Sequence, residues 1–300
     1  MTIDLRCSTW ARREGVHPIG TAGSFAGYLL VPWPLPWPRD VTDIKTLGPV
    51  AARARDLGYR LLALVPQPGE SARTLRCYRW HPGQGRYVGH SVTTTNDVAG
   101  TAWSLLEGEP LGRSEIKGTD VLICGHGRRD RCCGSIGTAL QMGIAEAGGL
   151  GSDVRVFRTS HTGGHRFAPT AIVLPSGTCW GYLDEEALGR IVTRSTDHRE
   201  DLFRYRGCTG LLSPRVQALE REVLEHIGWN LLDCGRRGTD RAGDLARLTI
   251  TDPDLGPRTF EGRVLPRRRL PVPECGVAIG QQSKTQDELF VTDFREIEED

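Results

Sequence analysis

The chain has 300 residues, of which 38% are hydrophobic and 25% charged, and these proportions exclude a disordered chain, a collagen and a polytopic membrane protein. Its 38 basic and 37 acidic residues give a net charge of +1, so no global field attracts nucleic acid or anionic lipid. The sequence has no run of about 18 apolar residues and begins without the basic-then-apolar order of a signal peptide. We therefore expect a cytoplasmic protein that binds neither nucleic acid nor membranes.

The first part of the chain, residues 1–117, is predicted to be an N-terminal α/β region. Four prolines break any regular element at residues 32–38. Apolar positions at helical spacing predict a helix over residues 43–58, and the apolar segment 59–65 that follows predicts a strand. Polar, glycine-rich segments then extend to about Gly118.

The second part, residues 118–195, is predicted to be a thioredoxin-like ferredoxin domain. Its first strand is short and apolar and delivers Cys124 at its end. The predicted elements are a strand at 121–123, a helix at 136–147, strands at 153–160, 171–174 and 178–183, and a helix at 184–192. The order strand, helix, strand, strand, strand, helix suits a compact α/β layer fold of the thioredoxin kind.

The third part, residues 196–300, is predicted to be a C-terminal helix followed by a small β-rich segment. Ser213 and Pro214 start the helix, which stops before Gly228. Three short strands are predicted at 246–250, 258–265 and 288–294. Three consecutive arginines at 267–269 are interpreted as a solvated surface turn.

Nine cysteines, an odd number in a long chain without an export signal, favour metal or redox chemistry over a disulfide framework. Cys124, Cys132 and Cys133 fall within ten residues of one another. The others stand alone and are interpreted as small buried hydrophobes. They are Cys7, Cys77, Cys179, Cys208, Cys234 and Cys275.

Two histidines, His161 and His165, follow the cysteine loop and flank Gly163 and Gly164. Glycine permits backbone bends that could turn both imidazole rings toward one point. Two thiolates and two imidazoles are the ligand inventory both of tetrahedral zinc and of a histidine-ligated 2Fe-2S cluster, and spacing alone does not separate the two.

The loop between the cysteines offers alternative ligands and neighbours. Cys132 competes with Cys133, and His126 completes half of a Rieske-type pattern with Cys124. Cys133 is predicted to start a helix, where the positive end of the helix dipole stabilises a thiolate. Further side chains are expected to tune or shield the centre, with Asp130 holding an arginine or accepting a hydrogen bond from a ligand imidazole. They are Arg128, Arg129, Asp130 and Arg166.

Other chemistries find less support. The cysteines contain no CxxC pair, and the sequence has no GxSxG elbow, no GxxxxGK[ST] phosphate loop and no HExxH helix. A thiol-dependent reductase that uses Cys132 and Cys133 remains a possible alternative. Whether the protein is an enzyme stays open, and an electron carrier is favoured over a stand-alone enzyme.

Four segments resemble the sucrase/ferredoxin-like family of thioredoxin-like 2Fe-2S ferredoxins. Two of them, 124–134 and 160–184, carry the candidate ligands, and the other two are 7–22 and 204–220. The resemblance implies an electron-transfer protein with a redox partner protein that the sequence does not identify. It also implies which residues hold the 2Fe-2S cluster. These ligands are Cys124, Cys133, His161 and His165.

Histidine ligation has a chemical consequence. With two thiolates and two neutral imidazoles an oxidised 2Fe-2S site is neutral, whereas four thiolates make it doubly negative, so histidine ligands raise the reduction potential. An imidazole that protonates on reduction would couple the electron to a proton. The competing hypothesis is a structural zinc ion held by the same four residues.

Overall fold

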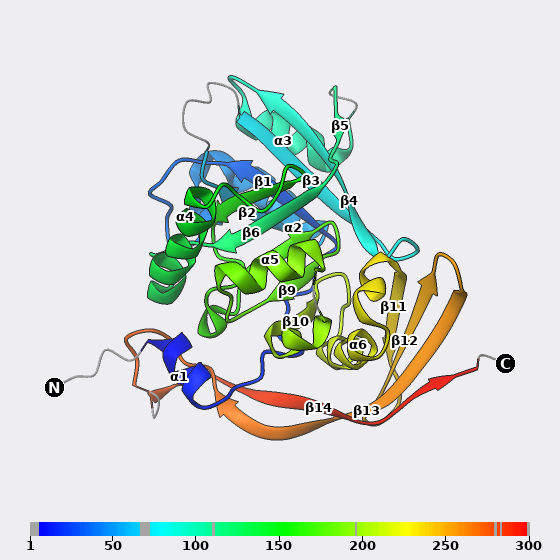
Figure 1. Ribbon diagram of the computed structural model, residues 1–300. Helices are drawn as coiled ribbons and strands as arrows, with labels where there is room; N and C mark the ends of the chain where they lie inside the picture. Colours follow the sequence, from blue (N-terminus) through cyan, green and yellow to red (C-terminus); the bar gives the residue numbers. More distant parts are fainter. Residues whose placement is uncertain are drawn as a thin grey trace.

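The computed structural model describes residues 6–66, 73–109, 112–195, 197–278, 281–282 and 284–298. The described part contains six α-helices, a ten-stranded sheet and a four-stranded sheet (Figure 1). The predicted mixed α/β class is therefore confirmed. None of the described helices is both long and apolar enough to cross a bilayer.

The large sheet draws strands from all three predicted parts of the chain. Its strands in spatial order are β10 (Tyr205–Cys208), β9 (Thr178–Trp180), β8 (Ala171–Leu174), β6 (Thr119–Cys124), β7 (Val154–Thr159), β2 (Tyr59–Leu64), β1 (Gly27–Pro32), β3 (Arg73–His81), β4 (Arg86–Thr94) and β5 (Ser114–Glu115). The predicted boundary at 117/118 falls between two strands of this one sheet, β5 and β6. The division into three domains stays a prediction.

The segment before Gly118, which is polar and rich in glycine and for which no helix or strand was predicted, contains β3, β4 and α3 (Val98–Glu107). On β3, Leu75 and Cys77 pack in one buried cluster and Tyr78 in another, and polar side chains alternate with them. Alternation of this kind lowers mean hydropathy without preventing a strand.

The large sheet curls. Tyr78 on β3 donates a hydrogen bond of 2.6 Å to Asp120 on β6, although three strands stand between β3 and β6. At about 4.8 Å per strand, a flat sheet would separate these two strands by about 19 Å. The two halves of the sheet therefore approach each other around a shared buried cluster that includes Leu30 and Leu122.

Helices cover the outer surfaces. α2 (Gly48–Asp56) and α3 pack with β1, β2 and β3 around the core residues Leu29 and Leu61. α4 (Thr138–Glu146) packs on β6 and β7, and α5 (Glu185–Thr193) lies beside α4. The order β6, α4, β7, β8, β9, α5 reproduces the order predicted for residues 118–195.

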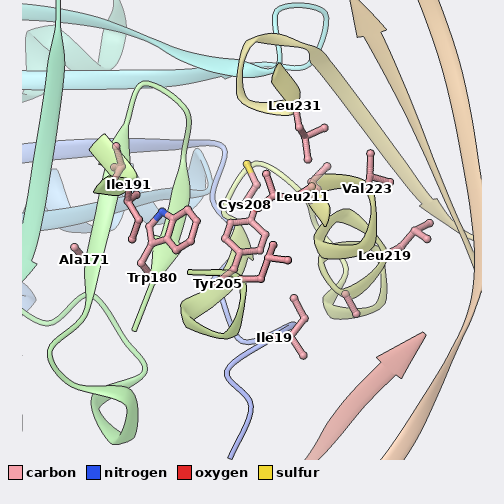
Figure 2. Packing of buried hydrophobic residues seen from close by; sticks show 14 of the residues in the cluster. Ile19, Ala171, Trp180, Ile191, Tyr205, Cys208, Leu211, Leu219, Val223 and Leu231 are labelled. Atoms are coloured by element: carbon pink, nitrogen blue, oxygen red, sulfur yellow. The ribbon is translucent and has the colours of Figure 1, made fainter. Parts of the chain in front are cut away.

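The C-terminal part begins with α6 (Pro214–Ile227), whose first turn is capped by the Ser213 hydroxyl as the Ser-Pro start predicts. Figure 2 shows α6 beside Trp180 and Tyr205 of the large sheet, with Leu219 on the opposite side of the helix. The helix also contacts the small antiparallel sheet. Its strands are β11 (Gly235–Asp240), β12 (Leu245–Asp252), β13 (Gly256–Pro271) and β14 (Thr285–Ile297).

The arginines at 267–269 lie within β13 and not in a surface turn, which corrects that interpretation. β13 and β14 form a hairpin much longer than the predicted strands, and its far end reaches α1 (Cys7–Arg13) near the other end of the chain (Figure 1). Arg268 fixes this contact, since it pairs with Glu288 at 2.7 Å and donates to the carbonyl oxygens of Glu14 and Gly15.

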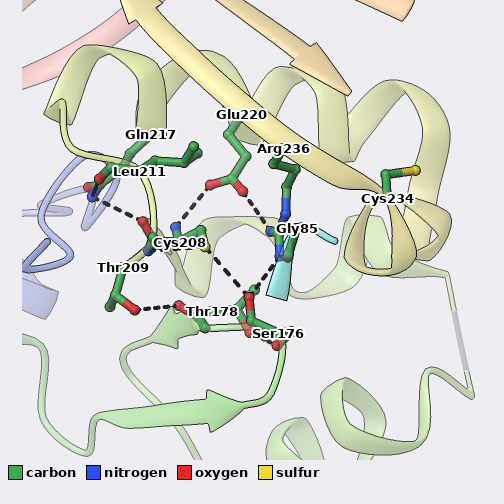
Figure 3. Close-up of polar contacts among 12 residues, drawn as sticks. Gly85, Ser176, Thr178, Cys208, Thr209, Leu211, Gln217, Glu220, Cys234 and Arg236 are labelled. Carbon is green, nitrogen blue, oxygen red and sulfur yellow. Dashed lines mark hydrogen bonds and ion pairs between the residues drawn. The ribbon is translucent and has the colours of Figure 1, made fainter. Parts of the chain in front are cut away.

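A buried ion pair joins α6 to the two sheets. Arg236 on β11 pairs with Glu220 on α6 at 2.8 Å, and it also donates to the carbonyl oxygens of Gly85 and Ser176 (Figure 3). Glu220 in turn accepts from the backbone N–H of Cys208. Every charge in this network has a partner, which a buried ion pair requires if it is not to destabilise the fold.

Candidate metal centre

Two parallel neighbouring strands end at the candidate site. β6 ends at Cys124, which is in register with Thr159 at the end of β7, and His161 follows two residues later. The carboxyl ends of parallel strands meet at one edge of a sheet, which is where α/β proteins place ligands. Segments that lie 37 residues apart in sequence therefore bring a thiol and an imidazole together.

Cys133 completes a group of three donors. It begins a π-helical turn, η3 (Cys133–Gly137), that leads into α4, and such turns occur often at functional sites. The donor atoms of Cys124, Cys133 and His161 all lie within 4.8 Å of one another. We call these three residues the strand-end group. Both of its cysteines are fully buried, and His161 is half-buried.

His165, the fourth predicted ligand, lies at the margin of this group. Its ring centroid is 6.0 Å from that of His161. Its Nδ1 atom lies 3.1 Å from the Asp130 carboxylate and 3.4 Å from the Cys7 sulfur. A carboxylate that accepts from one ring nitrogen fixes the tautomer and leaves the other nitrogen, Nε2, to bind a metal.

Asp130 has the position expected of an acceptor behind a ligand imidazole. Its Oδ1 atom accepts hydrogen bonds from the backbone N–H groups of Cys132 and Cys133, at 2.8 and 3.2 Å. Its Oδ2 atom faces His165. One buried carboxylate therefore orients both the cysteine turn and the histidine loop.

The two alternative ligands lie elsewhere. The sulfur of Cys132 is 3.2 Å from that of Cys275 and 3.7 Å from that of Cys7, so it faces away from the strand-end group. The Nε2 atom of His126 is 2.9 Å from the carbonyl oxygen of Pro38. His126 belongs to neither of the two donor groups found among the described residues.

Cys7 and Cys275 are not the lone buried hydrophobes that the sequence suggested, because their sulfurs lie 3.4 Å apart beside Cys132. Cys7 starts α1, and Cys275 lies in the connection between β13 and β14. No local pattern could have indicated this contact, since the two residues are separated by 268 positions.

The glycines of the histidine loop both adopt left-handed backbone angles, φ 90° at Gly163 and 72° at Gly164. This is the tight loop that the sequence predicted. A Cβ atom at Gly164 would collide with the guanidinium of Arg206. Arg206 supports the loop by donating a hydrogen bond to the carbonyl oxygen of Gly163. Sequence reasoning missed Arg206, although it lies in a segment that carries the family resemblance.

The predicted arginines divide into two kinds. Arg128 and Arg129 are exposed, whereas Arg166 is buried, stacks on Phe167 at 4.3 Å and donates to the Gln286 side chain. Burial lowers the pKa of Arg166 to about 10.

A cavity of about 300 Å³ opens beside His161. Among the described residues, four guanidinium side chains line it together with one carboxylate, that of Asp40. They belong to Arg39, Arg55, Arg60 and Arg129. The half-buried ring of His161 is therefore the part of the strand-end group that meets a positively charged recess.

The donor chemistry fits a thiolate-bound metal centre. A hydrogen bond from Cys133, together with the imidazole of His161, holds the pKa of Cys124 well below that of an ordinary thiol despite its burial. Thiolates and imidazoles are the ligands of both zinc and histidine-bound 2Fe-2S clusters. Cys124, Cys133 and His161 could hold either, with His165 as the fourth ligand through Nε2.

A sequence model described as sucrase/ferredoxin-like matches residues 18–207 of the chain. Searches of curated proteins and of solved structures gave no match to the chain. The matched range includes Cys124, Cys133 and both histidines, and it excludes Cys7 and Cys275.

Proposed function

Because the chain belongs to the sucrase/ferredoxin-like family, we propose that it is an electron-transfer protein whose 2Fe-2S cluster is held by two cysteines and two histidines. The ligands are Cys124, Cys133, His161 and His165. When bound, the cluster supplies one-electron redox chemistry. The resemblance drawn from residues 124–134 and 160–184 is confirmed at the level of the family, since both segments lie within the matched range.

The observation that carries the proposal is the meeting of two buried thiols and an imidazole at one sheet edge, with donor atoms within 4.8 Å of one another. The remaining histidine is oriented by a carboxylate, since the Nδ1 atom of His165 lies 3.1 Å from Asp130. A ring held in this way keeps its proton on Nδ1. The hydrogen bond to Asp130 therefore orients the ring and leaves Nε2 to bind the cluster.

The surroundings suggest how a partner could approach. The thiols are enclosed, whereas His161 lines the recess formed by the four arginines. A redox partner with acidic groups would be attracted to this recess and would bring its own centre close to the ring of His161. We propose that the partner is an acidic protein and that the reaction takes place in the cytoplasm.

A structural zinc ion is the second candidate. The compactness of the strand-end group favours it, because three donors within 4.8 Å suit a single ion, whereas each iron of a 2Fe-2S cluster takes two protein ligands. A zinc protein would be colourless and redox-silent. The two candidates therefore differ in elemental content and in visible absorption.

The test is iron, sulfide and zinc analysis of anaerobically isolated protein, with visible and electron paramagnetic resonance spectra. We expect roughly two iron and two sulfide ions per chain and a paramagnetic signal on reduction. Cys133→Ser should remove the colour, whereas Cys132→Ser is the matched control that should keep it. Zinc in place of iron in the wild type, with no visible band after reconstitution, would overturn the proposal.

The ligand role of histidine has its own test. His161→Cys replaces a neutral ligand by a charged one, and it should keep a cluster while lowering the midpoint potential by on the order of 100 mV. It should also weaken the dependence of the potential on pH, because one titratable ligand is lost. An unchanged potential would show that His161 is not a ligand.

A further inference from the structure

We propose that the chain holds a second metal site, separate from the strand-end group, that takes one zinc ion. Its ligands are Cys7, Cys132, Cys275 and Asp130, which we call the staple group. The donor atoms of these four residues all lie within 4.8 Å of one another. The proposal does not rest on the 2Fe-2S cluster, because neither the strand-end cysteines nor the histidines belong to it.

The distances within the staple group are those of a nearly formed tetrahedron. The three sulfur–sulfur distances are 3.2, 3.4 and 3.7 Å, and the sulfur of Cys7 lies 3.6 Å from Asp130. Around a zinc ion with Zn–S bonds of about 2.3 Å, tetrahedral ligand atoms lie about 3.6 to 3.8 Å apart. A small relaxation would therefore admit one ion.

The ligand types favour zinc. Three thiolates select soft or borderline cations, and a carboxylate oxygen is an accepted fourth ligand for zinc. Cys7 and Cys132 are fully buried, and Cys275 is partly exposed, so the ion would be enclosed but reachable. None of the nine cysteines forms a disulfide in the structure, so all three sulfurs are free to bind.

Electrostatics support an anionic site at this place. Zinc with three thiolates and a carboxylate carries two net negative charges. Arg166 is buried and has no carboxylate partner among the described residues, and it follows His165, whose Nδ1 atom lies 3.4 Å from the sulfur of Cys7. A buried cation without a counter-charge is costly, and the loaded site would supply one.

The site would act as a staple between distant segments. It would fasten the start of α1 and the β13–β14 connection to the cysteine turn, closing a chain loop that spans 268 positions. Cys132 is next to Cys133, and Asp130 also contacts His165. A metal here would therefore stiffen the turn that presents the strand-end group.

The test is zinc content after equilibration of the full-length protein with zinc and removal of the excess. Cys7→Ser and Cys275→Ser should each lose roughly one equivalent of zinc per chain relative to the wild type while keeping iron and visible absorption. Cys77→Ser is the matched control, because Cys77 is also buried but lies outside both donor groups. It should retain zinc at the wild-type level.

A second measurement uses the wild-type protein and tests the proposal even if the cysteine variants fail to fold. In the wild type, zinc should protect the three staple cysteines from alkylation, and a chelator should expose them, as read by mass spectrometry of the modified peptides. Equal zinc in the wild type and in Cys275→Ser would overturn the proposal. So would alkylation that zinc does not slow, or a Cys132–Cys275 disulfide in anaerobically isolated protein. Absence of iron from the wild-type protein, with zinc still bound by the staple group, would instead count against the 2Fe-2S proposal alone.

Discussion

Arg206 and Arg236 are both buried to 1% exposure, yet their surroundings differ. Arg236 faces Glu220 at 2.8 Å, so its charge is neutralised within the core. Arg206 donates to the hydroxyl and carbonyl oxygen of Thr21 and to the carbonyl oxygen of Gly163, and it has no carboxylate partner among the described residues. One region contains its counter-charge and the other does not.

The difference indicates where an anionic group is needed. Burial raises the pKa of Cys179 to about 11 and that of Tyr28 well above its usual value, so both neighbours of Arg206 are neutral at pH 7. The pKa of Cys124, by contrast, is lowered by Cys133 and His161. Of the cysteines that act on the pKa of Arg206, Cys124 is therefore the one that carries negative charge. A centre held there would be neutral when oxidised and negative when reduced, so it would supply a counter-charge to Arg206 on reduction.

The largest effect is expected where the pair is complete. Glu220→Gln removes the charge that faces Arg236 and should lower the free energy of unfolding by about 3–5 kcal/mol, because a buried guanidinium is left uncompensated. Chemical denaturation measures this loss, which should be the same with and without bound metal.

The control for that substitution is Glu107→Gln. Glu107 pairs with Arg53 at 2.6 Å, but both side chains are about one-third exposed. An exposed pair contributes little to stability, because water and salt screen its attraction. If Glu220→Gln and Glu107→Gln lowered the free energy of unfolding by similar amounts, burial would not explain how much the Arg236–Glu220 pair stabilises the fold.

The second prediction concerns Arg206→Met, whose effect should depend on the metal. In the loaded protein the substitution should cost about 1–3 kcal/mol, because two buried carbonyl oxygens lose a charged donor. With the cluster reduced, and so carrying one negative charge, the cost should be larger than with the neutral oxidised cluster, because the wild-type cation then has an anionic partner. Denaturation of both proteins in both states measures this coupling.

The same variant should also lower the midpoint potential, by on the order of tens of millivolts, because a nearby positive charge stabilises an added electron. Arg206→Lys keeps the charge and is the matched control, so it should stay closer to the wild-type potential. Equal potentials in the methionine and lysine variants would mean that Arg206 supports the glycine loop without acting on the centre.

The sequence predicted that Cys124 ends a short buried strand, that Cys133 starts a helix and that His161 follows a strand, and such signals are local. The choice of these residues as ligands came from the family resemblance, because spacing alone left Cys132 as an alternative to Cys133. Cys7, Cys275 and Arg206 could not be found in this way. Their positions depend on how α1, the long hairpin and β10 pack against the rest of the protein. A buried arginine such as Arg206 is also unexpected, because arginine side chains are usually exposed.

The smallest effect is expected at a third arginine, which is intermediate between the other two. Arg268 is partly exposed and pairs with the buried carboxylate of Glu288, which also accepts from the backbone N–H of His17. Burial alone would raise the pKa of Glu288, but these hydrogen bonds outweigh it and lower the pKa below 4.5. The stabilisation is therefore complete above the pKa that Glu288 has in the unfolded chain, and it is lost as the pH falls through the lower pKa of the folded protein.

Glu288→Gln should cost about 1 kcal/mol at pH 7 and less at acid pH, where the wild-type carboxylate is protonated. Denaturation of both proteins across this pH range measures the difference, and a cost independent of pH would show that the hairpin is held to the N-terminal segment by packing and not by this charge.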